Sequence, residues 1–149
     1  MTRKATSRRF VDGFSLEIPR GWEDLTEKGR GPITFGRAEG AGVLQLSAGI
    51  YRSGRLPEVS LTDLREMLSD FSAKRQLGTG SDIRVREEPL RSIGMSFSAQ
   101  GRFVRVWYVS DGVSVALVTY NCRLAEEGEE VAECESVVDS IRFDHERPH

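Results

Sequence analysis

No stretch of this 149-residue sequence is apolar for long enough to form a membrane-spanning helix, which takes roughly 18 or more residues. The basic segment at residues 1–9 is not followed by the apolar region of a secretory signal. We therefore expect a cytoplasmic protein without a membrane span. Residues 1–10 are expected to form a frayed N-terminal tail, residues 11–143 a single domain and residues 144–149 a frayed C-terminal tail.

Histidine is nearly absent, since the sequence holds only His145 and His149, both in the expected C-terminal tail. A catalytic Ser–His or Cys–His pair needs a base that a rigid frame holds within hydrogen-bond reach of the nucleophile. A tail does not provide such a frame. The sequence also lacks a Gly-x-x-x-x-Gly-Lys-Ser/Thr phosphate loop. We therefore expect no enzyme, no catalytic residues and no cofactor.

Cysteine is equally rare. Cys122 and Cys134 do not make the closely spaced set of four ligands that a zinc site requires, so we expect no metal site. In a reducing cytoplasm, two packed thiols are the favoured interpretation. A disulfide or redox switch between them stays open as the alternative.

The charges nearly cancel, because 21 Lys and Arg residues stand against 23 Asp and Glu residues, for a net charge of -2. Domains that bind nucleic acids usually carry a clear basic excess, so we expect no nucleic-acid partner. Lys4, Lys28 and Lys74 are the only lysines. The arginines are scattered along the chain, which is more typical of codon bias than of an anion-binding cluster.

Alternating apolar and polar residues predict a series of strands. The connections between the later strands are short, which favours an antiparallel meander. Asp111-Gly112 predicts a two-residue hairpin turn within it. The predicted strands span residues 14–18, 33–37, 43–51, 83–90, 92–100, 103–110 and 113–120, with a short final strand at 141–143.

Two helices are predicted from apolar residues at helical spacing. The first runs from Ser60, a suitable N-cap, to Leu77, with Asp63 placed to complete a capping box. The second spans Glu126 to Ser140. Because the last two strands of the meander are apolar on both faces, we expect both faces to be covered. The predicted fold is an α/β (α+β) sandwich, with a mostly antiparallel six- to seven-stranded sheet and a helix on each face.

The order of the elements and two short motifs resemble the Mog1/PsbP-like α/β/α sandwich group, which includes DcrB/DUF1795-type small bacterial domains. The first motif is a strand followed by Pro-x-Gly-Trp, at residues 14–22. The second is an apolar helix that leads into a strand, at residues 134–143. The resemblance implies a role in partner binding without catalysis, as in GTPase regulation, photosystem assembly, effector chaperoning or immunity. It transfers no site residue.

The surface is then the expected place of function. One candidate surface is the outer edge of the sheet, and the other is the acidic face of the second helix, which we expect to attract a basic partner. The candidate partner-binding residues are Gln45, Ser47, Tyr51 and Arg52 on the sheet edge and Glu129, Glu130 and Glu133 on the helix.

The favoured function is a non-enzymatic protein-binding module of the immunity-protein or secreted-effector-chaperone type. It would bind one specific protein partner, such as a toxin or an effector, and homodimer formation is left open. The alternative is a small-molecule or lipid sensor with a pocket between helix and sheet. An enzyme is the third class, and converging titratable groups with shifted pKa values would reveal it.

Overall fold

The structure, a computed structural model, describes residues 6–11, 13–27, 32–37, 40–50, 59–126 and 130–143. Within these residues, seven strands form one antiparallel sheet. In spatial order they are β3 (Trp22–Asp24), β4 (Ile33–Arg37), β5 (Gly42–Ile50), β9 (Ser114–Arg123), β8 (Arg102–Ser110), β7 (Arg91–Ala99) and β6 (Ser81–Arg86). A smaller sheet holds β1 (Thr6–Val11), β2 (Phe14–Pro19) and β10 (Arg142–Phe143), in that order.

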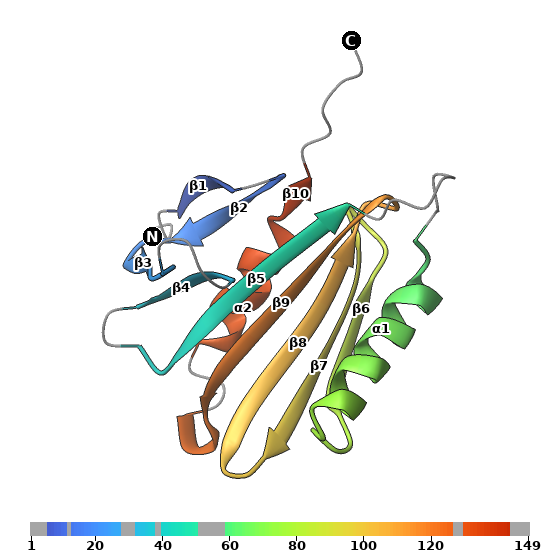
Figure 1. Ribbon diagram of the computed structural model, residues 1–149. Coiled ribbons are helices and arrows are strands. Elements are labelled where there is room, and N and C mark those ends of the chain that lie inside the picture. The colour runs from blue at the N-terminus through green and yellow to red at the C-terminus, as the bar shows by residue number, and fades with distance from the viewer. Residues whose placement is uncertain are drawn as a thin grey trace.

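The helices α1 (Leu61–Lys74) and α2 (Val131–Asp139) lie on opposite faces of the large sheet, as Figure 1 shows. Helix α1 packs against β7 and β8, and α2 packs against β9 and against β2 of the small sheet. The predicted sandwich, with a helix on each face of a mostly antiparallel sheet, is therefore confirmed. No helix in the described part of the chain is long and apolar enough to cross a membrane.

Helix α1 begins as the sequence predicts. The Ser60 hydroxyl accepts a hydrogen bond from the backbone N–H of Asp63 at 3.1 Å, and the Asp63 carboxylate accepts one from the Ser60 N–H at 2.9 Å. These two bonds form the predicted capping box and satisfy two N–H groups that a helix start leaves unpaired. Leu64 and Leu68 fill the buried stripe of this helix.

The sheet separates two apolar cores. The larger lies on the α2 side, where Cys134, Val137 and Val138 of α2 meet Trp107 and Tyr120 of the sheet. The smaller lies on the α1 side. Its buried members are Val59, Leu64, Leu68, Ile93, Phe97 and Val106. Trp22 and Trp107 are both buried in the larger core.

Several predicted boundaries were wrong. Thr6–Val11 forms strand β1, paired along its length with β2, where a frayed tail was expected over residues 1–10. Helix α2 begins at Val131, and a short 3-10 turn, η1 (Leu124–Glu126), occupies its expected start. A glycine at position 128 disfavours one continuous helix through this region. The three-residue strand β3 was also missed, because it is too short to show an alternation.

The meander itself is confirmed, with a longer turn than predicted. The last paired residues of β8 and β9 are Ser110 and Val115, so the turn exceeds the predicted two-residue hairpin by two residues. The Asp111 carboxylate explains the difference, since it accepts hydrogen bonds from the N–H groups of Val113 at 2.9 Å and Ser114 at 2.8 Å. Gly112 does adopt the expected positive φ, of 102°.

Candidate binding groove

A groove lies on the α1 side of the sheet, where the cover of the sheet is incomplete. Helix α1 packs over β7 and β8, and in Figure 1 neither of the two described α-helices lies over the same face of β5 and β9. The groove between α1 and these two strands measures about 600 Å³. Its lining residues are Pro32, Val43, Gln45, Leu46, Ser47, Phe71, Arg75, Leu77, Val104, Leu117, Thr119 and Asn121.

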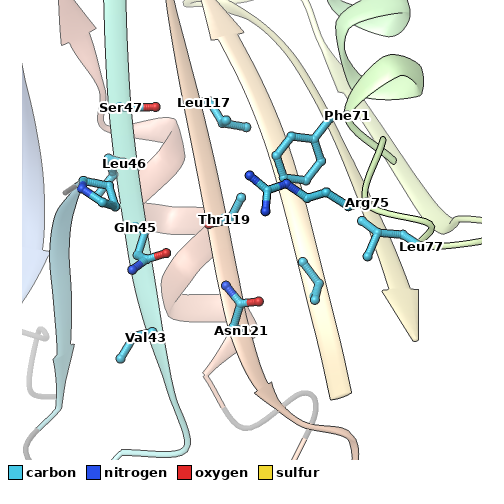
Figure 2. A pocket seen from close by; sticks show the side chains of 12 residues that line it. Val43, Gln45, Leu46, Ser47, Phe71, Arg75, Leu77, Leu117, Thr119 and Asn121 are labelled. Carbon is cyan, nitrogen blue, oxygen red and sulfur yellow. The ribbon is translucent and has the colours of Figure 1, made fainter. Parts of the chain in front are cut away.

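The floor of the groove alternates apolar and uncharged polar side chains. Gln45 of β5 stands opposite Thr119 of β9, and Val43 stands opposite Asn121 in the next row of the same face. Such cross-strand partners lie about 5 Å apart at their Cβ atoms, so the two rows form one continuous surface. Figure 2 shows the carboxamide of Gln45 on β5 and that of Asn121 one row away on β9, on the same face of the sheet.

The wall of the groove comes from the end of α1 and the residues that follow it. The guanidinium carbon of Arg75 lies 4.6 Å from the centroid of the Phe71 ring, within the range of a cation–π contact. Phe71 in turn packs edge-on against Tyr108, with ring centroids 6.5 Å apart. Burial raises the pKa of Tyr108, and the positive charge of Arg75 acts in the opposite direction. Arg75 is therefore supported by an edge-to-face aromatic pair.

The polar side chains on the groove floor have no hydrogen-bond partner among the described residues. Within the part of the chain that the structure describes, the side chains of Gln45, Thr119 and Asn121 make no hydrogen bond, and Arg75 makes no ion pair. Arg75 is also the single ionisable side chain among the described lining residues. The groove thus offers two carboxamides, hydroxyls, apolar contacts and one cation, and it offers no pair of groups for proton transfer.

Of the four residues predicted at the sheet edge, the structure describes the surroundings of two. Gln45 and Ser47 line the groove, but β5 is not an edge strand, because it pairs with β4 on one side and β9 on the other. The expected place at the outer edge of the sheet was therefore wrong. Tyr51 and Arg52 lie outside the described residues.

The predicted acidic surface of the second helix was wrong for Glu130, and Glu129 lies outside the described residues. Glu130 is only 4% exposed. It accepts hydrogen bonds from the Tyr120 hydroxyl at 2.8 Å and from the Gly42 N–H at 3.2 Å. Glu133 also turns toward the sheet, where it binds Arg37 and accepts a bond from the Trp22 indole at 3.3 Å.

The remaining acids of α2 are engaged in the same way. Glu135 accepts hydrogen bonds from Arg105 at 2.6 Å and from the Trp107 indole at 3.0 Å, and it also binds Arg84. Asp139 binds Arg84 at 3.1 Å. These contacts link α2 to the sheet, and Arg105 is only 4% exposed. The acids within α2 itself are therefore paired with arginines of the strands.

Cys122 and Cys134 are both free and buried, which agrees with the expectation of packed thiols. Burial raises the pKa of both. A buried neutral thiol is a poor nucleophile. Among the described residues, no group of His, Cys, Asp and Glu side chains is placed to hold a metal ion. His145 and His149 lie outside the described residues.

Sequence reasoning missed most of the groove. Thr119 and Asn121 left a signal, because they continue the apolar series Val113, Val115 and Leu117 on one strand face with polar residues. Such a change marks the point where the cover of a sheet ends. Phe71 and Arg75 gave no comparable signal, since their place on the wall depends on how α1 crosses the sheet.

Comparison with known proteins identifies the fold. No family model and no curated protein match the sequence. The solution structure of PsbP (CyanoP) from Synechocystis sp. PCC 6803 is similar with a TM-score of 0.63 and 14% identity, over 96% of this chain and 95% of that one.

A crystal structure from Bacteroides thetaiotaomicron VPI-5482 is similar with a TM-score of 0.60 and 17% identity, over 92% of this chain. This chain spans only 48% of that structure's length. Likenesses at this level of identity concern the fold alone. The chain has a Mog1/PsbP-like α/β fold.

Proposed function

We propose that this chain is a non-enzymatic protein-binding module, of the immunity-protein or secreted-effector-chaperone type, and that one protein partner binds in the groove. The observation that carries the proposal is the unused polar floor beside α1. Gln45, Thr119 and Asn121 present donors and acceptors that the described part of the fold leaves unbonded. A partner that satisfies them gains hydrogen bonds at little cost to the fold.

The chemistry of the groove supports binding over catalysis. Its single ionisable lining residue among those described is Arg75, whose guanidinium stays protonated in proteins. General acid–base catalysis needs a group that exchanges a proton near the working pH. A stoichiometric partner needs only complementary shape, hydrogen bonds and charge.

A small-molecule or lipid sensor is the second candidate. The volume of about 600 Å³ is the observation that favours it, because ligand sites commonly measure roughly 300–1,000 Å³. The wide, polar floor favours the protein partner, since typical ligand sites enclose most of the ligand and are lined mainly by apolar groups.

The test uses a substitution that fills the floor. Thr119→Tyr places a ring in the middle of the groove, and Thr62→Tyr places the same ring on an exposed position of the first turn of α1. We expect wild-type protein and Thr62→Tyr to capture the same protein from the native host. Thr119→Tyr is expected to lose it while keeping the wild-type circular dichroism spectrum.

The captured protein is then purified and titrated, with a stoichiometry of about one to one expected. A metabolite or lipid that co-purifies with the wild type and is lost from Thr119→Tyr would replace the proposal with the sensor. Capture that is equal for all three proteins would show that the groove is not the binding site.

A further inference from the structure

We propose that the partner binds the groove through an extended peptide segment, and that an Asp or Glu side chain within this segment pairs with Arg75. The inference rests on the proposed function, because it specifies the partner chemistry at the same groove. The partner segment proposed here is acidic, whereas the sequence led us to expect a basic partner attracted by an acidic helix.

Charge complementarity is the first argument. Arg75 supplies the only formal charge among the described lining residues, and the described part of the chain provides no carboxylate for it. The arginines on the α2 side differ: Arg37, Arg84, Arg86 and Arg105 each bind an acid of α2. Among the described residues that line the groove, Arg75 is therefore the one charged group that a partner would meet.

The orientation of Arg75 is the second argument. Its guanidinium stacks on the Phe71 ring, which restrains the long side chain and leaves the N–H edges open to the groove. Figure 2 shows the guanidinium extending from the α1 side toward β9, at the level of Thr119. A planar fork held in this way suits bidentate pairing with a carboxylate.

The floor indicates an extended segment. Gln45 and Asn121 each carry a donor and an acceptor, which is what a peptide group needs from a partner. Leu117 and Val43 give apolar contact along the same strands. A chain that runs along β5 and β9 meets these groups in succession, with its side chains pointing alternately into the groove and away from it.

The position of Arg75 along the floor indicates a side-chain carboxylate. In Figure 2, Ser47 and Leu117 lie beyond it in one direction, and Val43 and Asn121 lie beyond it in the other. A segment that fills the floor therefore continues on both sides of Arg75. An acidic residue inside the segment reaches the guanidinium, whereas a chain terminus would leave half of the floor empty.

A displayed library of random linear peptides provides the probe. Peptides are selected on the wild-type protein after removal of those that also bind Thr119→Tyr. Enriched sequences are then synthesised, with both free and amidated C-termini, and their affinities are measured by fluorescence anisotropy. Two arginine variants are compared. One is Arg75→Gln in the groove, and the other is Arg65→Gln, at an exposed arginine of α1 that does not line the groove.

We expect an Asp or Glu at one internal position of the selected peptides. Changing that residue to its amide, or changing Arg75 to Gln, is expected to weaken binding about tenfold, since a charge-assisted hydrogen bond contributes about that factor or more. The two changes together should cost little more than either alone. Amidation of the C-terminus and Arg65→Gln should leave the affinity unchanged.

Two results overturn the inference while the proposed function stands. One is a set of groove-dependent peptides without an acidic residue and with equal affinity for Arg75→Gln. The other is binding that requires the free C-terminal carboxylate. Failure to select any peptide that distinguishes the wild type from Thr119→Tyr overturns the inference as well. The proposed function is then decided separately, by whether Thr119→Tyr loses the captured protein.

Discussion

Glu130 lies at the start of α2 with its carboxylate enclosed between the helix and the sheet. Its side chain is accessible to solvent for only 6% of its surface, and it accepts hydrogen bonds from Tyr120 and Gly42. The Nε atom of Arg37 lies 3.8 Å from a carboxylate oxygen of Glu130, so this ion pair adds only a weak attraction. A buried carboxylate with two donors is costly to remove alone, because both donors then lose their partner.

Substitution of Glu130 by Ala is therefore expected to lower the free energy of unfolding by about 2–4 kcal/mol, the cost of leaving two buried donors unpaired. Chemical denaturation measures the change, with Glu23→Ala on the exposed face of β3 as the control, expected within about 0.5 kcal/mol of the wild type. Tyr120→Phe removes one of the two donors. The double variant should then cost less than the sum of the single changes, and strict additivity would show that the hydrogen bond contributes nothing.

The acids of α2 show why residue roles were harder to predict than elements. Glu130 and Glu133 are three positions apart, so they share one helix face, and this face turns out to point at the sheet. Their partners come from distant strands: Arg37 from β4 and Tyr120 from β9. In the sequence, a cluster of acids on a helix indicates a solvent-exposed face. The arginine and tyrosine partners can be identified only once the strands are placed beside the helix.

The turn between β8 and β9 combines two local devices. Asp111 binds the N–H groups of the following residues through its carboxylate, and Gly112 adopts a φ of 102°. A Cβ atom at position 112 would meet only Arg91, at 3.7 Å, so space is available for a side chain. The requirement for glycine is therefore one of backbone conformation.

Gly112→Ala is expected to lower the free energy of unfolding by about 1 kcal/mol or more, because an L-residue is strained at this φ. Gly112→Asn is the matched comparison, since asparagine tolerates positive φ better than alanine does. Urea denaturation should rank the stabilities as wild type, then Asn, then Ala. Equal stability of the Ala variant would mean that the turn adopts another conformation in solution.

Helices and strands could be predicted from the sequence where their pattern involves residues that are close together in the chain. The capping box of α1 and the strands β7, β8 and β9 with their short connections depend on residues that are close in sequence, and all were predicted. Strand β1 was not predicted, because Thr6–Arg9 is polar and basic and the strand forms by pairing with β2. The place of β5 inside the sheet was missed for a similar reason, since strand order is a property of the whole fold.

The molecule as a whole is asymmetric about its large sheet. On one side, α2 and the small sheet enclose a core that includes Phe14 of β2 and Trp107 of β8. On the other side, α1 covers only part of the sheet, and the groove occupies the remainder. Apart from the polar residues Gln45, Ser47, Thr119 and Asn121, the groove could not be predicted from the sequence, because its extent depends on the width of the sheet relative to one helix. This asymmetry also places the proposed binding wall, with Phe71 and Arg75, on the less extensively packed helix.

Native-state hydrogen exchange is expected to reveal this difference in packing. Amides in the middle of α1, from Leu64 to Leu68, should exchange through a partial opening that costs less free energy than global unfolding, because fewer buried apolar side chains hold the helix. Amides of β8 and β9 near Val106 and Val118 lie at the centre of the sheet and should exchange only with global unfolding. Helix α2, anchored in the larger core, serves as the internal comparison.

The same experiment on Leu68→Ala gives a second test, since Leu68 belongs to α1 and its side chain is buried in the smaller core. Loss of a buried leucine side chain costs about 2–5 kcal/mol. If α1 opens separately, this loss should lower the free energy of opening measured at the α1 amides. The difference in this free energy between α1 and β8 should widen or stay unchanged. Equal protection of α1 and β8 in the wild type would show that the domain opens as one unit. The wall of the groove would then be as rigid as its floor, and a partner would have to fit it without adjustment of α1.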